Sequence, residues 1–116
     1  MTAESPSIFS RIIDRELPAD IVAETDDLIA IRDINPQAEL HLLVIPKTGA
    51  YRDVTELADD PELLAKVVRL AADLAKQYAD GQFRLVFNTG AEAGQSVFHV
   101  HAHVLAGATL DEGRLA

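Results

Sequence analysis

Residues 98–105 read Phe98-His99-Val100-His101-Ala102-His103-Val104-Leu105 and carry three of the four histidines in the chain. Successive side chains on a β-strand point to opposite faces of the sheet. The three imidazoles therefore share one face of the predicted strand, and the apolar residues between them share the other. The pattern predicts a strand whose apolar face is buried and whose other face presents the histidines.

The remainder of the chain alternates short strands with two helices. A long helix is expected between an N-cap at Asp60 and a stop at Gly81, because apolar residues recur there at helical spacing. A short helix is expected to follow an N-cap at Ser5 and to end before Pro18. Because the connections between successive strands are short, antiparallel pairing is favoured. The predicted fold class is α+β, a five-stranded antiparallel sheet packed with one long and one short helix, with the other strands at residues 21–24, 28–33, 41–45 and 83–88.

The composition limits the functions to be considered. The chain has 116 residues, a net charge of -9 at pH 7 and no cysteine. The negative charge disfavours nucleic acid and anionic membranes as partners. The lack of cysteine excludes disulfides, thiolate nucleophiles and cysteine-ligated zinc. The length predicts a single domain over residues 1–116. From the charge we expect no nucleic-acid or membrane partner. Since the N-terminal segment lacks the basic start and apolar run of a signal peptide, we expect a cytoplasmic protein.

A metal site is one interpretation of the histidine row. His99 and His103 would be about 13 to 14 Å apart at Cα along an extended strand. A tetrahedral zinc ion needs each ligand nitrogen at about 2.0 to 2.1 Å, so one ion cannot easily bind all three rings. A site made of two of these histidines and completed by His41 or Asp33 stays open as an alternative, as does a row of solvent-exposed polar side chains without function.

Phosphoryl chemistry is the sharper interpretation. A row of imidazoles can bind phosphate oxygens, one neutral ring can act as a nucleophile, and its neighbours can stabilise the charge that develops. His101 is the natural nucleophile because it is flanked on both sides. The preceding loop supplies Gly90 and Gly94, which allow close backbone approach, and the donors Gln95 and Ser96.

The same residues carry a family resemblance. Asn88 followed by GAEAGQSVFHVHAHVLAG from Gly90 to Gly107 resembles the signature of the histidine-triad (HIT) family, and SIFSRII and RDINPQAELHLLVIPK resemble its Hint branch. The resemblance extends from about Ile8 to Gly107. It implies a homodimer in which two five-stranded sheets join into one ten-stranded sheet. It also implies hydrolysis of purine nucleoside 5'-phosphoramidates, such as AMP linked to an amine, through a covalent nucleotidyl-histidine and without a metal or cofactor.

The resemblance also implies residue roles. His101 would attack the α-phosphorus, His99 and His103 would bind phosphate oxygens and orient the nucleophile, and Ser96 would assist the leaving amine. Asp33 matches the residue that grips the ribose hydroxyls, and His41 matches a further histidine near the triad. The remaining nucleotide-binding positions are Asn88, Gly94, Gln95 and Val97 around the phosphate, and Phe9, Ile12, Ile31, Ile34 and Leu43 around the base.

Two departures from the family pattern bear on function. Many bacterial relatives carry two cysteines near the first helix that help to bind zinc, whereas Ser7 and Ser10 stand at those places here, so no metal is expected. The tail from about residue 108 diverges from that of well-known Hint proteins. Within the family, a dinucleoside polyphosphate hydrolase is an alternative, although Ala106-Gly107 stands where that branch usually has proline. A nucleotide-binding regulatory protein with incidental hydrolysis is another alternative.

Overall fold

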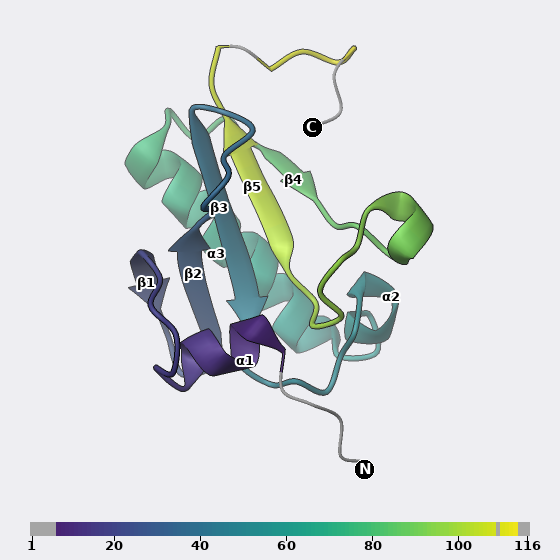
Figure 1. Ribbon diagram of the computed structural model, residues 1–116. Helices are drawn as coiled ribbons and strands as arrows, with labels where there is room; N and C mark the ends of the chain where they lie inside the picture. The colour runs from purple at the N-terminus through teal and green to yellow at the C-terminus, as the bar shows by residue number, and fades with distance from the viewer. Residues whose placement is uncertain (1–6, 109, 114–116) are drawn as a thin grey trace.

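The computed structural model describes residues 7–108 and 110–113. Its five strands form one antiparallel sheet in the order β1-β2-β3-β5-β4 (Figure 1). The predicted α+β architecture is therefore confirmed, while two short turns of helix, α2 and η1, were not foreseen. The elements are α1 (Ile8–Ile13), β1 (Ile21–Glu24), β2 (Leu28–Arg32), β3 (Leu40–Pro46), α2 (Val54–Leu57), α3 (Pro61–Tyr78), β4 (Arg84–Val86), η1 (Ala91–Ala93) and β5 (Ala102–Ala106).

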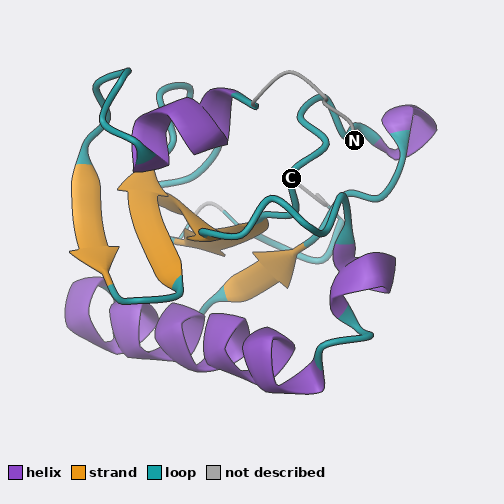
Figure 2. Cartoon of the chain, turned by 90° about the horizontal axis from the view of Figure 1, so that it is seen from below, coloured by secondary structure: helices purple, strands orange, loops and turns teal. Residues whose placement is uncertain are grey.

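The sheet separates two apolar layers, with α3 along one face and α1 on the other (Figure 2). Alternation along the central strand β3 assigns Leu42 and Val44 to the α3 layer, and Leu43 and Ile45 to the α1 layer. Every residue of β3 is buried, which explains the apolar run from Leu42 to Pro46. The α3 layer continues through Leu63, Val67, Ala71 and Leu74 of the helix and through Val100, Ala102 and Val104.

The long helix begins as its sequence predicts. The side chain of Asp60 accepts a hydrogen bond from the backbone N–H of Leu63 at 3.2 Å, which satisfies one of the free amides of the first turn. The helix ends at Tyr78, and Gly81 follows with a φ of 82°. Within the described residues, no helix is both long enough and apolar enough to cross a membrane.

The short helix begins two residues later than the prediction. Ser5, the predicted N-cap, lies outside the described residues, and the cap of α1 is Ser7, whose hydroxyl oxygen accepts a hydrogen bond from the N–H of Ser10 at 3.0 Å. Both serines have the chemistry of a cap. Ser7 is selected because Ile8, the next residue, is the first to adopt helical geometry.

The last strand is shorter than the predicted residues 98–105, because β5 begins at Ala102 and its ladder with β3 ends at the pair Val44 and Ala102. Continued beyond that pair, the same register would set His101 opposite Ile45 and then Val100 opposite Pro46, which has no N–H to donate. The carbonyl of Pro46 is already bonded to the ring of His99 at 2.7 Å. The ladder therefore stops, and only His103 of the triad lies within a strand. The strand predicted at 83–88 is likewise reduced to β4.

Candidate active site

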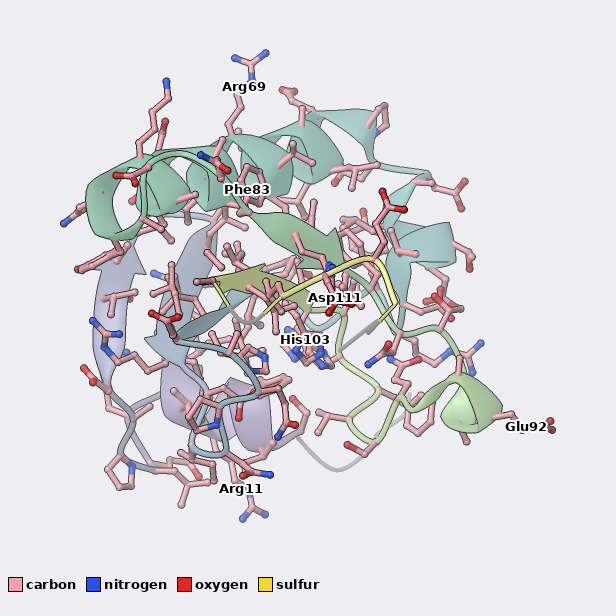
Figure 3. All side chains as sticks on the ribbon, turned by 90° about the horizontal axis from the view of Figure 1, so that it is seen from above. Arg11, Arg69, Phe83, Glu92, His103 and Asp111 are labelled. Carbon is pink, nitrogen blue, oxygen red and sulfur yellow. The ribbon has the colours of Figure 1, made fainter. Side chains whose placement is uncertain are left out.

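The four histidines gather on the α1 side of the sheet, at the junction of β3 with the segment that leads into β5. His41 lies on β3, and its Nε2 is 2.9 Å from Nδ1 of His103 on β5. The rings of His101 and His103 lie 5.3 Å apart between centroids. In Figure 3 the half-buried His103 lies near the centre of the view, whereas Arg11 and Glu92 project from its periphery. The three triad rings share one face, as the alternation predicts, although two of them precede the strand.

His99 has both ring nitrogens engaged by the protein. The carbonyl oxygen of Pro46 can only accept, so Nε2 of His99 carries the proton of this 2.7 Å hydrogen bond. Nδ1 then has a lone pair, and it lies 2.9 Å from the hydroxyl oxygen of Ser7. The side chain of His99 is only 2% exposed. Burial lowers its pKa, against the opposing effect of the bond to Pro46, so the ring is neutral at pH 7.

His101 is oriented by its neighbour's backbone. Its Nδ1 lies 2.8 Å from the carbonyl oxygen of His99 and must donate the proton. The neutral ring then has its lone pair on Nε2, which is the form a nucleophilic imidazole requires. The ring of Phe9 packs edge-on against it at 4.8 Å between centroids. Burial is the main cause that lowers the pKa of His101, and this keeps the lone pair available at neutral pH.

His103 receives a hydrogen bond from His41 through a directional chain. The backbone N–H of Gln37 donates to Nδ1 of His41 at 3.0 Å, so the proton of the neutral His41 ring is on Nε2. That proton is donated to Nδ1 of His103, and the proton of the neutral His103 ring is therefore on its Nε2. Burial, together with the nearby His101 and His41, lowers the pKa of His103 to about 4. The chain thus makes Nε2 of His103 a hydrogen-bond donor.

The protons on Nε2 of His41 and Nε2 of His103 disfavour a metal ion at this site. Asp33, His41 and His103 bring ligand atoms within 4.8 Å of one another, which is close enough to share an ion. Metal-binding nitrogens must have a free lone pair. Nε2 of His41 could provide one only if the ring lost its proton altogether or gave up the Gln37 amide. The three side chains are better suited to hydrogen bonding than to coordinating zinc.

The loop before the triad is built around Gln95, which is buried. Its amide oxygen accepts from the N–H of Gly90 at 2.9 Å, and its amide nitrogen donates to the carbonyls of Arg52 at 2.7 Å and Val97 at 3.0 Å. Gln95 therefore shapes the loop. Gly94 has a φ of 95°, in the region that favours glycine.

The structure places the predicted phosphate-binding residues of this loop in different surroundings. A Cβ added at Gly94 would lie 3.8 Å from the side-chain nitrogen of Asn88, so these two positions are adjacent. Val97 packs on the α1 layer. Ser96 is exposed on the loop. The loop thus brings the predicted phosphate-binding positions to the same stretch of chain as the triad, with Ser96 on its outer surface.

The predicted sugar and base positions are only partly brought together. Asp33 lies next to the histidines, with a carboxylate oxygen 3.5 Å from Nε2 of His41. Its other oxygen accepts from the N–H of Asn35 at 2.8 Å. Ile34 stands apart because its side chain is 99% exposed. The other base-pocket positions, Phe9, Ile12, Ile31 and Leu43, pack together in the buried α1 layer.

Sequence reasoning did not find the groups that hold the imidazoles. They are the carbonyl of Pro46, the amide of Gln37 and the hydroxyl of Ser7. Every residue has a backbone, so the first two leave no signal in the sequence. Ser7 was noticed only as a substitute for cysteine.

Comparison of the sequence with known proteins assigns the chain to a family. The family model of the HIT domain covers residues 14–110. The chain belongs to the HIT family. The purine nucleoside phosphoramidase of Escherichia coli (strain K12) is 42% identical over 108 residues, which are 90% of this chain and 89% of that protein. An uncharacterised HIT-like protein of Synechocystis is 47% identical over 102 residues, 87% of this chain and 90% of its own.

The structural comparison agrees. A solved HIT family hydrolase from Clostridium thermocellum superimposes with a TM-score of 0.86 at 38% sequence identity, covering 94% of this chain and 96% of the other. The HIT fold is therefore shown by sequence and by structure, and the relatives include hydrolases.

Proposed function

We propose that this HIT protein hydrolyses purine nucleoside 5'-phosphoramidates through a covalent intermediate on His101. The observation that carries the proposal is the bond from Nδ1 of His101 to the carbonyl of His99 at 2.8 Å, which leaves the Nε2 lone pair free. The similarity to a phosphoramidase over most of both chains supports the same reaction.

The reaction proceeds in two displacements at phosphorus. Nε2 of His101 attacks the α-phosphorus, a P–N bond to the ring forms, and the P–N bond to the amine breaks. The leaving amine takes up a proton that comes from solvent, a step to which we assign Ser96 as the assisting residue. Water then attacks the nucleotidyl-histidine: a P–O bond forms, the P–N bond to the ring breaks, and its electron pair returns to Nε2. The proton that the attacking water loses passes to solvent, and the nucleotide is released. Nε2–H of His103 donates to a phosphoryl oxygen in both steps, where a fixed donor stabilises the developing charge.

The ribose and the base are assigned to Asp33 and to the apolar residues near it. A carboxylate can accept hydrogen bonds from both hydroxyls of a ribose. Exposed Ile34 is adjacent to Asp33 in the chain, so it can cover a base whose sugar is held by that carboxylate. Asn88, Gly94 and the amide of Val97 are assigned to the phosphate.

A second copy of the chain is proposed along β4. This strand ends the sheet order and pairs with β5, and in the described part of the chain no strand pairs with its outer edge. A strand at the end of a sheet can add a further strand along its outer side. A dimer formed there would have twice the 12.6 kDa of one chain, which light scattering after size exclusion measures directly.

The experiment that tests the function compares the wild-type protein with His101→Ala on adenosine 5'-phosphoramidate and on a diadenosine polyphosphate. We expect the wild type alone to turn over the phosphoramidate, with AMP binding retained in the variant. Turnover of only the dinucleotide would favour the polyphosphate hydrolase. AMP binding without turnover of either compound would favour a binding protein. Near-normal turnover by His101→Ala would refute the nucleophile.

A further inference from the structure

The segment that carries His99 and His101 is held in place by side chains and isolated backbone bonds. It precedes β5, so the strand ladder does not fix it. The N–H of Val100 donates to the carbonyl of Tyr51 at 3.0 Å. The ring of His99 is attached to Pro46 through Nε2. A further attachment is on the other side of the same ring, where α1 begins.

Ser7 serves two purposes at that position. Its oxygen accepts from the N–H of Ser10 and caps α1. Its single O–H proton has two acceptors within reach, the oxygen of Ser10 at 3.2 Å and Nδ1 of His99 at 2.9 Å. We assign the proton to Nδ1 of His99, because that contact is the shorter one and this buried nitrogen has no proton of its own. The hydroxyl of Ser10 stands behind it, 3.2 Å from the Ser7 oxygen and 3.4 Å from the same nitrogen. The two residues 7 and 99 are far apart in sequence, so this contact joins α1 to the triad.

We propose that Ser7, supported by Ser10, is a positioning residue for His101 and acts through His99. The proposal rests on the proposed function, in which His101 is the nucleophile. Held between the Ser7 hydroxyl and the Pro46 carbonyl, the His99 ring has one orientation and one tautomer. The backbone of His99 is thereby fixed, and its carbonyl faces Nδ1 of His101.

The consequence for chemistry lies in the position of a proton. Without the Ser7 hydroxyl, Nδ1 of buried His99 keeps only the more distant hydroxyl of Ser10 at 3.4 Å, and the ring can rotate or exchange tautomers to find a closer partner. The carbonyl of His99 then loses its fixed direction. His101 would carry its proton on Nε2 for part of the time, and in that form it cannot attack phosphorus.

The competing interpretation is that Ser7 only caps the helix and has no effect on the triad. Substitutions of Ser7 and Ser10 distinguish this interpretation from the positioning role. Ser7→Gly removes the hydroxyl, yet glycine is accepted at N-caps with little loss of helix stability. Ser7→Thr retains both the cap and the O–H donor. Ser10→Ala removes the more distant hydroxyl and leaves the bond from Ser7 to His99 in place.

The test combines ¹⁵N NMR of the imidazoles with steady-state kinetics on adenosine 5'-phosphoramidate. In the wild type we expect His99 to be protonated on Nε2 and His101 on Nδ1. In Ser7→Gly we expect mixed tautomers at His101 and a kcat lowered about tenfold, the usual scale for a lost hydrogen bond that leaves a buried partner unsatisfied. KM should change by less than about twofold, since the binding contacts remain. Ser7→Thr should restore the wild-type spectrum and rate, and Ser10→Ala should have the smaller effect.

Several results would overturn the proposal. The first is that His99 of the wild type is protonated on Nδ1. The second is that the tautomer of His101 is unchanged in folded Ser7→Gly. The third is that Ser7→Thr restores neither the spectrum nor the kcat that Ser7→Gly has lost. The NMR measurement needs no substrate, so it tests the positioning role even if the wild type hydrolyses no phosphoramidate. In that case the proposed function fails while the link from Ser7 to His101 is judged on its own.

Discussion

Nε2 of His41 lies 2.9 Å from Nδ1 of His103, while the N–H of Gln37 lies 3.0 Å from Nδ1 of the same His41 ring. A backbone amide can only donate, so the two contacts impose one direction on the whole chain of hydrogen bonds. The direction ends at Nε2 of His103, whose proton is the donor that the proposed mechanism assigns to a phosphoryl oxygen. His41 is buried, and water does not easily replace it as the donor.

Two substitutions of His41 separate its donor from its acceptor. The side-chain nitrogen of glutamine occupies the place of Nε2, and the side-chain oxygen of asparagine occupies the place of Nδ1. His41→Gln therefore keeps a donor for His103, whereas His41→Asn keeps only an acceptor for Gln37. We expect kcat to fall about tenfold in His41→Asn, and by less than about threefold in His41→Gln, because only the former leaves Nδ1 of His103 without its donor.

The stability of the two variants provides the control. Each loses one partly buried hydrogen bond of His41, which costs at most about 1 to 3 kcal/mol when the remaining partner is unsatisfied. Urea unfolding should therefore report similar losses for both, even though their rates differ. Equal rates in the two variants would contradict the directional chain.

The hypothesis of hydrolysis without a metal predicts that EDTA leaves the rate unchanged. In this mechanism the charge on phosphorus is met by imidazoles, and no step needs a Lewis acid. The measurement is kcat before and after dialysis against the chelator. Loss of activity that Zn²⁺ restores would contradict the prediction, and it would assign the metal to Asp33, His41 and His103 if His41→Asn abolished the restoration.

The elements were predictable where a repeat in the sequence reports burial. Val67 and Leu74 at helical spacing predicted the inner face of α3, and the alternation of Val100, Ala102 and Val104 predicted which face of the triad segment is buried. The start of β5 was not predictable, since it depends on where the register with β3 would reach Pro46 and on the bond from the N–H of Val100 to the carbonyl of Tyr51. The tautomers were not predictable either, because a carbonyl and an amide distant in sequence determine them. Local sequence patterns therefore predict which face of a helix or strand is buried, whereas the hydrogen-bond partners of the histidines follow only from the assembled fold.

Neighbouring valines on α3 test the assignment of its inner face. Val67 is fully buried, whereas Val68 is 41% exposed. Val67→Ala removes two buried carbons and leaves a cavity, so we expect the free energy of unfolding to fall by about 2 to 3 kcal/mol. Val68→Ala should change it by less than about 0.5 kcal/mol, as is usual on a surface. Urea unfolding of both variants measures the difference, and equal losses would mean that α3 is rotated about its axis.

The pH dependence of kcat/KM tests whether His101 is the nucleophile in its neutral form. Protonation of Nε2 removes the lone pair, so the rate falls on acidification. Burial lowers the pKa of His101 below its ordinary value of 6.5, although the bond to the His99 carbonyl and the charge of Asp33 oppose this shift. The midpoint of the acid limb is therefore expected below pH 6.5, with little change of rate above about pH 7.5.

The Phe9 ring supplies part of that burial, since it packs edge-on against His101 at 4.8 Å. Phe9→Ala admits water to the imidazole, favours its charged form and should move the midpoint upward toward 6.5. Phe9→Leu keeps an apolar cover and is the matched control, in which the midpoint should stay near that of the wild type. Both variants change KM if Phe9 contacts the base, and this changes the plateau value of kcat/KM. The midpoint pH of the fall in acid is determined independently of that plateau value. A midpoint above 6.5 in the wild type, or one that Phe9→Ala leaves in place, would mean that burial by α1 does not control the proton on the nucleophile.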